Sequence, residues 1–429
     1  MSSVCVHGLG YIGLPTAAML ANYDHDVSGY DADTTVISEL RDGEIHLDEP
    51  GLRAFVTQAL ESGKLELVEE IVPAKYHVVC VPTPFDSDEK AADLSYVRAV
   101  GDAVAPVLRT GDTVILESTV PPGTTTGTLQ PILEESGLTA GDDFALVHCP
   151  ETVLPGNIIT ELRQNARIVG GVNGISTESA VHLYDSFVEG EIHTTADPTT
   201  AEFVKLIQNT FRDTNIGLAN EIARLANDYG IDSREAIEMA NEHPRVDILQ
   251  PGPGVGGHCL PVDPWFLGVD SDELDLIATA RQVNDGMVEF VAELLAEEVN
   301  SLAGTRIAIL GVAYKGNVGD TRMSPGLRLA RELQHGHRQA VPATDGGSPE
   351  SPAVAIHDPH VEDPTLDLQT LEAATIDADA VVIATGHDEF GDLDPHALGE
   401  RMAQRTIIDT KAILDPERWR EAGFTVRRI

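Results

Sequence analysis

The sequence has 429 residues, 42% of them hydrophobic, and its 70 acidic and 28 basic residues give a formal charge of −42. This length exceeds what one hydrophobic core supports, so two or three domains are expected. The charge disfavours nucleic acid and anionic membranes as partners; it is typical of proteins adapted to high salt, although a generally acidic surface is the simpler interpretation.

Cysteines and lysines are few. The four cysteines are too scattered for a disulfide framework or a zinc knuckle, so we expect a reducing compartment and no metal. The chain starts without a signal-peptide pattern and has no run of about eighteen apolar residues, so a cytoplasmic protein without a membrane span is expected. Only six basic residues are lysines, so a lysine inside a motif is a candidate functional residue. Lys205, Lys315 and Lys411 are such candidates.

Residues 1–196 are predicted to form a first α/β domain. Short β-branched segments alternate there with helix-length segments, which is typical of βαβ units and a parallel sheet. The predicted strands have the sequences VCVHGL, DVSGYD, YHVVCVP, DTVILES, FALVHCP and ARIVGGV. Cys5, Cys80 and Cys149 lie in three of these strands, where a small buried side chain is the ordinary interpretation.

A glycine turn follows the first strand. GLGYIG has the G-x-G-x-x-G spacing between that strand and a helix through LPTAAMLANY, which permits close approach of a pyrophosphate to the helix N-terminus. Asp31, at the end of the next strand, is suited to ribose hydroxyls and disfavours a 2′-phosphate, so NAD is expected rather than NADP. A turn that only packs helix on strand is the alternative. The turn residues expected at the cofactor are Gly8, Gly10, Tyr11, Ile12 and Gly13.

Two threonines follow later strands of this domain. Thr83 lies in VPTP and Thr119 in ESTVPPGTT. Ligand crevices form at the carboxyl ends of parallel strands. Each threonine is therefore expected on the cofactor side, with a simple turn or cap as the alternative.

The pattern becomes helical between residues 197 and 302. Apolar residues recur every three or four positions through AEFVKLIQNTFRDTNIGLANEIARLANDYG, which predicts a long helix. The Gly/Pro-rich loop LQPGPGVGGHCLPVDPWF interrupts the helical region, and a second long helical segment is predicted near 274–302.

Residues 303–429 are predicted to form a second α/β domain. Its strands are expected in TRIAILGVAYKGNVGD, AVAIHDP, DAVVIAT and TIIDT, with an exposed loop at HGHRQAVPATDGGSPESPA. The expected fold is therefore α/β, with two parallel-sheet, Rossmann-like domains joined by a long helix and a helical central domain.

Cys259, in VGGHCLPVDPWF, allows three interpretations. A metal ligand needs partners that His258 alone does not supply, and a packing residue belongs in an apolar run rather than a glycine-rich loop. A nucleophile needs an approachable backbone, a nearby cation and an oriented acid or base. The neighbouring glycines and Asp263 meet two of these needs, so the nucleophile is favoured.

Positive charge is available from other segments. Lys205 and Asn209 lie four residues apart on one helix face, suited to a developing oxyanion, although a solvated face is the usual meaning of such a pair. Lys315 and Arg322 lie in a strand-to-helix loop suited to phosphate or sugar, and Arg245 is a further cation for anionic ligands.

Taken together, the motifs resemble the UDP-glucose/GDP-mannose dehydrogenase family. They are GLGYIG, VPTP, STVPPGTT, CPETVLPGN, KLIQNTFRDTNIGLANE, PGPGVGGHCLPVDPWF and GVAYKGNVGDTR, in family order from residue 4 to about 330. The resemblance implies an NAD-binding domain at 1–196, a central domain with the cysteine loop at 197–302 and a nucleotide-sugar domain at 303–429. It also implies oxidation of a sugar C6 hydroxyl to a carboxylate with two NAD per turnover.

The same resemblance implies roles for single residues. The Cys259 thiolate traps an aldehyde as a thiohemiacetal, which becomes a thioester that water releases. Lys205 and Asn209 stabilise oxyanions, Asp263 and Thr119 orient or activate water, and Glu151 assists the acyl-enzyme stage. The residues expected at the substrate are Glu151, Leu154, Lys205, Asn209, Arg245, Gly256, Lys315 and Arg322. Arg245 resembles an arginine that reaches the sugar pocket, from the same chain or from a neighbouring subunit.

The cysteine loop also bears on the branch of the family. This loop resembles that of dehydrogenases acting on UDP-N-acetylmannosamine and related N-acetylhexosamines. The features that carry this resemblance are His258, Val262 and the segment HPRVDILQPGPG. Thr152 stands where relatives commonly carry arginine, and Pro261 where close relatives vary. UDP-glucose and UDP-N-acetylglucosamine therefore remain alternative substrates.

Two other functions compete with this one. A two-electron dehydrogenase would stop at the aldehyde, and a non-catalytic sensor would bind NAD and a nucleotide sugar without turnover. The expected partners are a UDP-sugar and further copies of the chain, as a homodimer or higher homo-oligomer, in the biosynthesis of a polysaccharide or other glycan.

Overall fold

The computed structural model describes residues 1–47, 49–154, 156–335 and 351–429, in two compact units. The first unit comprises Met1–Gln208 with Trp265–Asp272, and the second comprises Asn209–Pro264 with Glu273–Ile429. Residues 336–350, most of the predicted exposed loop, lie outside the described residues. The boundaries predicted at 196/197 and 302/303 stay predictions.

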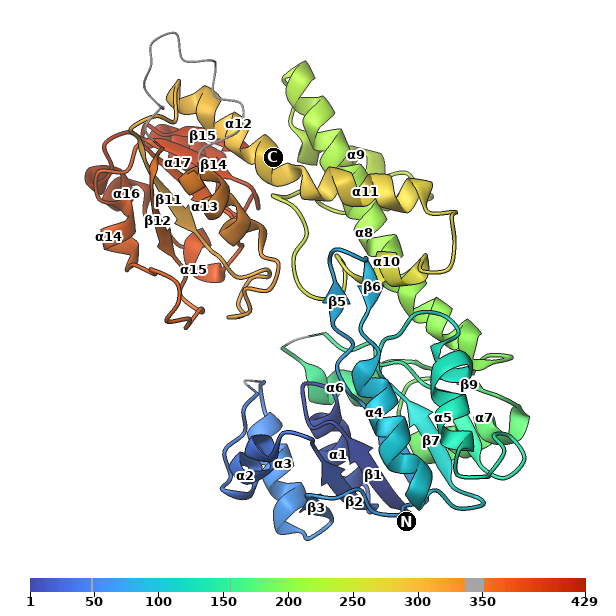
Figure 1. Cartoon of the computed structure of the whole chain (residues 1–429). Helices are drawn as coiled ribbons and strands as arrows, with labels where there is room; N and C mark the ends of the chain where they lie inside the picture. The colour runs from blue at the N-terminus through green and yellow to red at the C-terminus, as the bar shows by residue number, and fades with distance from the viewer. Residues whose placement is uncertain (48, 155, 336–350) are drawn as a thin grey trace. The chain divides into compact units, whose positions relative to one another are not determined.

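The first unit is built on an eight-stranded sheet (Figure 1). In spatial order its strands are β10 (Ile192–Thr194), β9 (Arg167–Gly171), β8 (Ala145–His148), β7 (Thr113–Leu116), β4 (Tyr76–Val79), β1 (Ser3–His7), β2 (Asp26–Tyr30) and β3 (Leu65–Val68). All six predicted strands are confirmed. Two were missed: β3, in which Glu66 interrupts the apolar residues, and β10, which has three residues and only one apolar side chain.

Helices cover both faces of this sheet. One core contains α1 (Gly13–Asn22), α2 (Thr34–Arg41), α3 (Leu52–Glu61), α6 (Ile158–Gln164) and α7 (Gly174–Tyr184). The other contains α4 (Ser95–Val104), α5 (Gln130–Glu134) and the π-helical segment Thr125–Leu129, and the single turn Ala105–Val107 directly follows α4. The strand order reverses between β1 and β4, so the loops after these two strands flank the crevice where such sheets bind ligands.

One strand of this sheet departs from the predicted parallel arrangement. β9 pairs antiparallel with β8, with His148 opposite Gly170, whereas the other neighbouring pairs in the sheet are parallel. In an antiparallel pair, the end of one strand and the start of the next lie at the same edge. Arg167, which begins β9, therefore lies at the edge where β8 ends.

The helical region contains the long helix that was predicted. Helix α8 (Pro198–Tyr229) has 32 residues, and the Asp197 carboxylate accepts a hydrogen bond from the Thr200 N–H near its start (2.8 Å). The second predicted segment, 274–302, is two helices, α11 (Asp275–Asp285) and α12 (Met287–Val299), on either side of Gly286. The short helices are α9 (Ser233–Asn241) and α10 (Asp263–Leu267), and the small hairpin of the first unit is β5 (Phe85–Asp86) with β6 (Ala91–Ala92).

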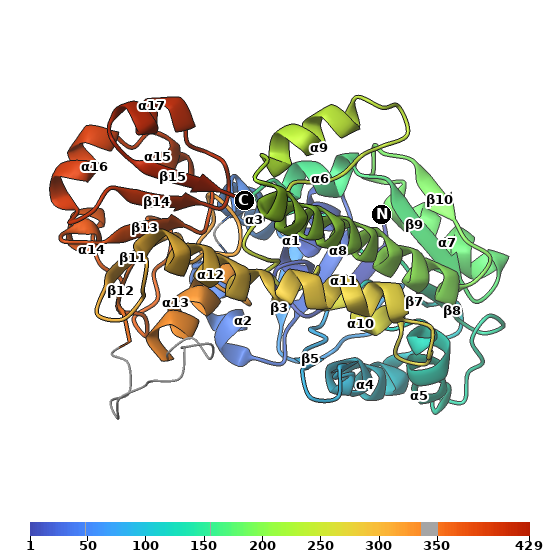
Figure 2. The same cartoon turned by 90° about the horizontal axis from the view of Figure 1, so that it is seen from above.

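The second unit contains a five-stranded parallel sheet. Its spatial order is β12 (Ala353–His357), β11 (Arg306–Leu310), β13 (Ala380–Ile383), β14 (Thr406–Asp409) and β15 (Thr425–Arg428). Helices α12 and α13 (Pro325–His335) pack on one face, and α14 (Leu371–Thr375), α15 (Asp388–Gly391), α16 (Pro395–Arg401) and α17 (Pro416–Glu421) pack on the other (Figure 2). The strand order reverses between β11 and β13, beside the loop that carries Lys315 and Arg322.

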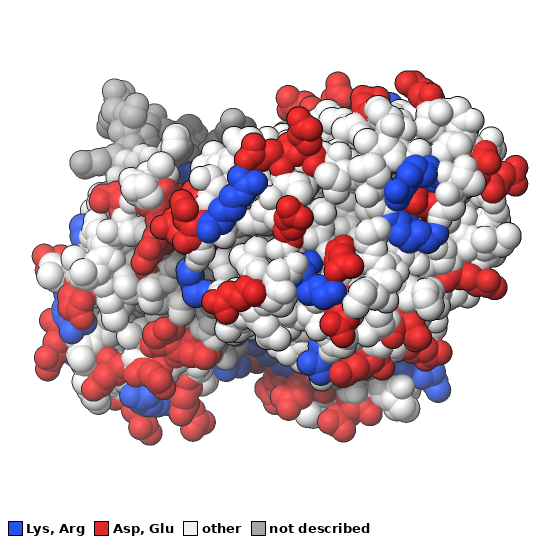
Figure 3. Space-filling view, turned by 90° about the horizontal axis from the view of Figure 1, so that it is seen from below, with Lys and Arg blue, Asp and Glu red and all other residues white. Residues whose placement is uncertain are grey.

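The surface is acidic, as the composition predicts. Acidic side chains are scattered over the face shown in Figure 3, and basic ones occur in small groups. Among the described helices, none combines the length and the apolar character that crossing a membrane requires.

Candidate active site

The glycine turn has the geometry that a dinucleotide site needs. Gly8 has φ +88°, and a Cβ at this position would lie 2.7 Å from the Cys80 carbonyl oxygen. A Cβ on Gly13 would lie 1.8 Å from the Gly8 carbonyl oxygen, whereas one on Gly10 would meet nothing within 4 Å. Gly8 and Gly13 are therefore required by the turn itself, while Gly10 leaves open space where a pyrophosphate could approach.

The acid that was predicted for the ribose lies beside this turn. The Asp31 carboxylate accepts hydrogen bonds from the backbone N–H groups of Leu9 (2.7 Å) and Asp33 (2.9 Å). Its position at the end of β2 and against the turn fits the ribose end of NAD. Within the turn, Tyr11 donates a hydrogen bond to Glu49, and Ile12 precedes α1 and packs against the core.

The two predicted threonines come together. The Thr83 hydroxyl donates a hydrogen bond to the Thr119 carbonyl oxygen (2.7 Å), which joins the loops after β4 and β7. Glu202 of α8, which the sequence analysis missed, accepts hydrogen bonds from the Thr125 N–H (2.7 Å) and from its hydroxyl (2.6 Å). The loop that carries Thr119 is thereby tied to the start of α8.

His148, the last residue of β8, lies close to Lys205 within the first unit. Both imidazole nitrogens of His148 are buried, and burial and then the charge of Lys205 lower its pKa to about 3. His148 is therefore neutral at neutral pH. Glu151 is buried and forms an ion pair with Arg167 (2.7 Å), while Leu154 of the same loop is exposed.

Asn209 and Asp263 meet in the second unit. The Asn209 amide donates a hydrogen bond to the Asp263 carboxylate (2.6 Å), and both side chains are buried. The backbone N–H groups of Val262 and Asp263 both donate to the Cys259 carbonyl oxygen, at 3.0 Å and 2.8 Å. This turn fixes Asp263 at the start of α10, next to the cysteine loop. Lys205 belongs to the other unit, so its pairing with Cys259 stays a prediction.

The cysteine loop packs on the loop of the predicted phosphate residues. The Gly257 N–H donates to the Arg322 carbonyl oxygen (2.9 Å), and a Cβ on Gly256 would lie 2.8 Å from the Tyr314 Cβ. The Arg322 guanidinium is paired with Asp320, whose hydrogen bond is the main cause of a raised pKa at Arg322; the nearby Cys259 contributes in the same direction. Cys259 is half-buried, and the paired Arg322 guanidinium is the cation that lies near it.

The second unit holds three other basic residues that the sequence analysis singled out, Lys315, Arg245 and Lys411. Lys315 and Arg245 are exposed, and the Arg245 backbone N–H donates to His243. The Lys411 ammonium approaches the backbone of the cysteine loop, 3.4 Å from a Cβ position on Gly252. Burial, and then the charge of Arg234, lower the pKa of Lys411 to about 8.

The other three cysteines are buried, as predicted. Burial raises the pKa of Cys5 to about 11 and that of Cys149 to about 12, so both are neutral thiols at neutral pH. Cys5 lies beside the buried pair His7 and His77, whose facing ring nitrogens are 3.1 Å apart. This group was not predicted, because its members come from two strands.

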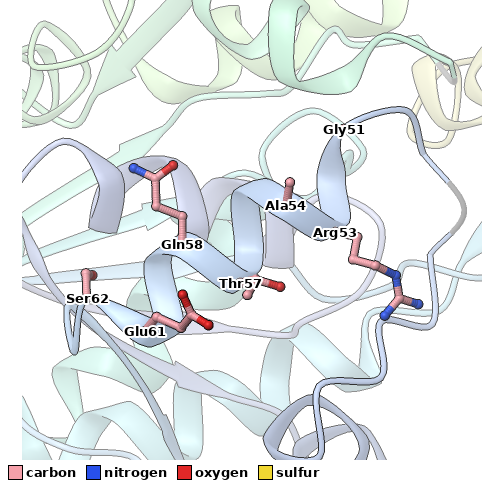
Figure 4. A pocket seen from close by; sticks show the side chains of 7 residues that line it. All are labelled: Gly51, Arg53, Ala54, Thr57, Gln58, Glu61 and Ser62. Atoms are coloured by element: carbon pink, nitrogen blue, oxygen red, sulfur yellow. The ribbon is translucent and has the colours of Figure 1, made fainter.

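A surface hollow lies on α3 (Figure 4). It is lined by Gly51, Arg53, Ala54, Thr57, Gln58, Glu61 and Ser62. None of the predicted site residues lines it, so it lies apart from the predicted active site.

Comparison with known proteins gives a consistent result. Models of the UDP-glucose/GDP-mannose dehydrogenase family match residues 2–188 (NAD binding domain), 199–286 (central domain) and 308–416 (UDP binding domain). The chain is 40% identical to a UDP-N-acetyl-D-mannosamine dehydrogenase of Methanococcus maripaludis, over 100% of this chain and 97% of the relative.

Two solved structures share the fold over the full length. A UDP-D-ManNAc dehydrogenase of Pyrococcus horikoshii has a TM-score of 0.90 and 42% identity, covering 100% of this chain and 99% of that chain. A UDP-N-acetyl-mannosamine dehydrogenase of Staphylococcus aureus has a TM-score of 0.87 and 36% identity, covering 100% and 98%.

Proposed function

Because the chain belongs to the UDP-glucose/GDP-mannose dehydrogenase family, whose members are NAD-dependent nucleotide-sugar dehydrogenases, we propose that it oxidises UDP-N-acetyl-D-mannosamine to the mannosaminuronate. The names of the full-length relatives support the sugar. The observation that carries the four-electron chemistry is the buried Asn209–Asp263 hydrogen bond beside Cys259.

The proposed reaction forms and breaks bonds at the Cys259 sulfur. The sugar C6 alcohol loses a hydride and a proton, and the thiolate adds to the resulting aldehyde to give a thiohemiacetal. Loss of a second hydride gives a thioester, and water cleaves it to the carboxylate and the free thiol. Bound NAD would accept one hydride in each oxidation step.

The surrounding residues are proposed to stabilise charge and move protons. Lys205 and Asn209, four residues apart on α8, would hold the oxyanions of the two tetrahedral species. Asp263, held by Asn209, would orient water together with Thr119, and Glu151 would assist thioester cleavage. Arg322, Lys315, Arg245 and the backbone at Gly256 would bind the UDP-sugar, and Leu154 would line its sugar end.

The yield of NADH per sugar tests this proposal. With limiting UDP-N-acetyl-D-mannosamine in high salt, two NADH per sugar are expected, followed by absorbance at 340 nm. A yield of one would support a two-electron enzyme. Binding of NAD and UDP-sugar without NADH from any sugar would support the sensor. Parallel assays compare the rates with UDP-glucose and UDP-N-acetylglucosamine. If either sugar reacts faster than UDP-N-acetyl-D-mannosamine, the proposed substrate is rejected.

We further propose that the chain forms a homodimer through α8. Large hydrophobic side chains are exposed along this helix at intervals of four or seven residues, which places them on one face. They are Phe203, Ile207, Phe211, Leu218, Leu225 and Tyr229. An apolar face of this length on one helix is typical of a protein interface.

Light scattering tests the dimer. Phe211→Asp is expected to shift the protein from dimer to monomer, because it buries a charge in the interface. Ile175→Asp, at an exposed position on α7, is the matched control and should leave the mass unchanged. A monomeric wild-type protein would refute the dimer.

The setting is proposed on more general grounds. No disulfide joins any of the four cysteines, all of which lie in the described part of the chain, and this supports a reducing compartment such as the cytoplasm. The charge of −42 supports function at high salt. A sugar acid is a building block for a surface polysaccharide or another glycan, which is the proposed use of the product.

A further inference from the structure

We propose that Arg167 is a positioning residue that fixes the Glu151 carboxylate at the edge of the first sheet for the acyl-enzyme stage. Neither the sequence motifs nor the resemblance pointed to Arg167. The inference rests on the proposed function only for the role of Glu151, and its geometry lies entirely within the first unit.

Both oxygens of Glu151 are held. Oε2 is 2.7 Å from Arg167 Nη2, and Oε1 accepts a hydrogen bond from the Thr152 N–H (2.7 Å). The side chains of Glu151 and Arg167 are 7% and 3% exposed. An ion pair at one oxygen and a hydrogen bond at the other restrict the orientation of this buried carboxylate, as a general base or water-orienting group requires.

The reversed strand explains how Arg167 reaches this position. β8 and β9 pair antiparallel with Val147 opposite Gly171 and His148 opposite Gly170. Continued in the same register beyond the end of β8, the pairing sets Arg167 opposite Glu151. A parallel β9 would have placed Arg167 at the opposite edge of the sheet.

A second carboxylate anchors the guanidinium. Glu117 Oε1 lies 3.5 Å from Arg167 Nη1 and accepts a hydrogen bond from the Tyr184 hydroxyl (2.6 Å). The guanidinium also lies over the Tyr184 ring, 4.7 Å from its centre. Arg167 is thus held on two sides and is rigid enough to fix Glu151.

The same network reaches the dinucleotide turn. Glu117 Oε2 accepts a hydrogen bond from the Cys80 thiol (3.1 Å), and the Cys80 carbonyl oxygen limits the space at Gly8. Two buried carboxylates therefore share one guanidinium between the cofactor turn and the Glu151 loop. Without the guanidinium, both carboxylates would lie in a buried site with no cation, and proton uptake would be favoured.

Two substitutions separate charge from shape. Arg167→Met removes the cation, and Arg167→Lys keeps the charge but loses the two-pronged contact. Arg163→Met is the matched control, because Arg163 lies on the neighbouring helix α6 and forms an exposed ion pair with Glu189. Tyr184→Phe, which removes the hydroxyl that bonds to Glu117 and keeps the ring, serves if Arg167→Met fails to fold.

The first readout is the pH dependence of kcat. We expect Arg167→Met to lower kcat by about 10- to 100-fold, the size of effect that misplacing a catalytic group has. The acidic limb of its profile should move to higher pH, because removing a buried cation favours proton uptake by the carboxyl groups around it. Arg167→Lys should restore the position of the acidic limb but only part of kcat. Tyr184→Phe should change kcat and the acidic limb in the same direction as Arg167→Met, but less. Arg163→Met should match the wild type in both.

The second readout does not require turnover. In Arg167→Met, carboxyl groups of raised pKa are protonated in the folded state and ionised in the unfolded state, so stability should fall as pH rises from about 5 to 8 relative to the wild type. Thermal unfolding measures this.

The outcomes distinguish the two proposals. The positioning role is overturned if the wild type is active and Arg167→Met leaves the acidic limb of the pH profile unchanged, even if kcat and stability fall. If Arg167→Met does not fold, the same criterion applies to Tyr184→Phe. A different outcome would overturn the proposed function instead. In that case Arg167→Met shows the pH-dependent loss of stability, which supports the buried network, but the wild type forms no NADH from any UDP-sugar.

Discussion

Replacing Cys259 with serine is expected to reduce sugar-acid formation by about three orders of magnitude or more, the loss that follows removal of a catalytic nucleophile. Cys259 is half-buried in a glycine-rich loop, with the Arg322 cation nearby and the hydrogen-bonded Asn209–Asp263 pair next to it. A serine hydroxyl is a far weaker nucleophile at neutral pH, so the thioester cannot form at a useful rate. Acid formation is measured by chromatography of the UDP-sugar products.

The residual reaction of this variant is informative. Without the thioester, at most one hydride can leave per sugar, so residual NADH should not exceed one per sugar. Cys5→Ala is the control, because Cys5 is buried on β1 in the first unit, and this variant should keep full activity. Wild-type acid formation by Cys259→Ser would refute the covalent mechanism.

The second large effect concerns the glycine turn. Gly13→Ala is expected to abolish NAD binding and to lower the thermal midpoint, because the added Cβ would lie 1.8 Å from the Gly8 carbonyl oxygen. The Gly8 carbonyl oxygen is a backbone atom and the added Cβ is bonded directly to the backbone. Neither can rotate away, so the turn must open to accept the methyl group.

Gly10→Ala distinguishes a cofactor site from a structural turn. A Cβ on Gly10 meets nothing within 4 Å, so the thermal midpoint should stay that of the wild type. The methyl group would occupy space through which the pyrophosphate approaches, and NAD affinity should fall by about tenfold or more, which is ~1.4 kcal/mol. Calorimetry measures the affinity. Normal NAD binding by Gly10→Ala would show that the turn only packs helix on strand.

The features that the sequence predicted have local causes. The spacing of Gly8, Gly10 and Gly13 follows from backbone sterics in one turn, and α8 follows from an apolar period along one segment. The cysteine loop stood out for the same reason, since glycine and proline disfavour a helix or strand there. The break at Gly286 was missed because the apolar pattern continues across it.

By itself, the sequence determined the class of fold and the dinucleotide turn with Asp31, and it predicted Cys259 as the nucleophile. Only the tertiary structure brought Asn209 to Asp263, Arg322 to Cys259, and Arg167 between Glu117 and Glu151. Local patterns depend on neighbours along the chain, whereas these pairs depend on strand order and direction. The antiparallel β9 is the clearest case, because no spacing within its segment reveals which way it runs beside β8.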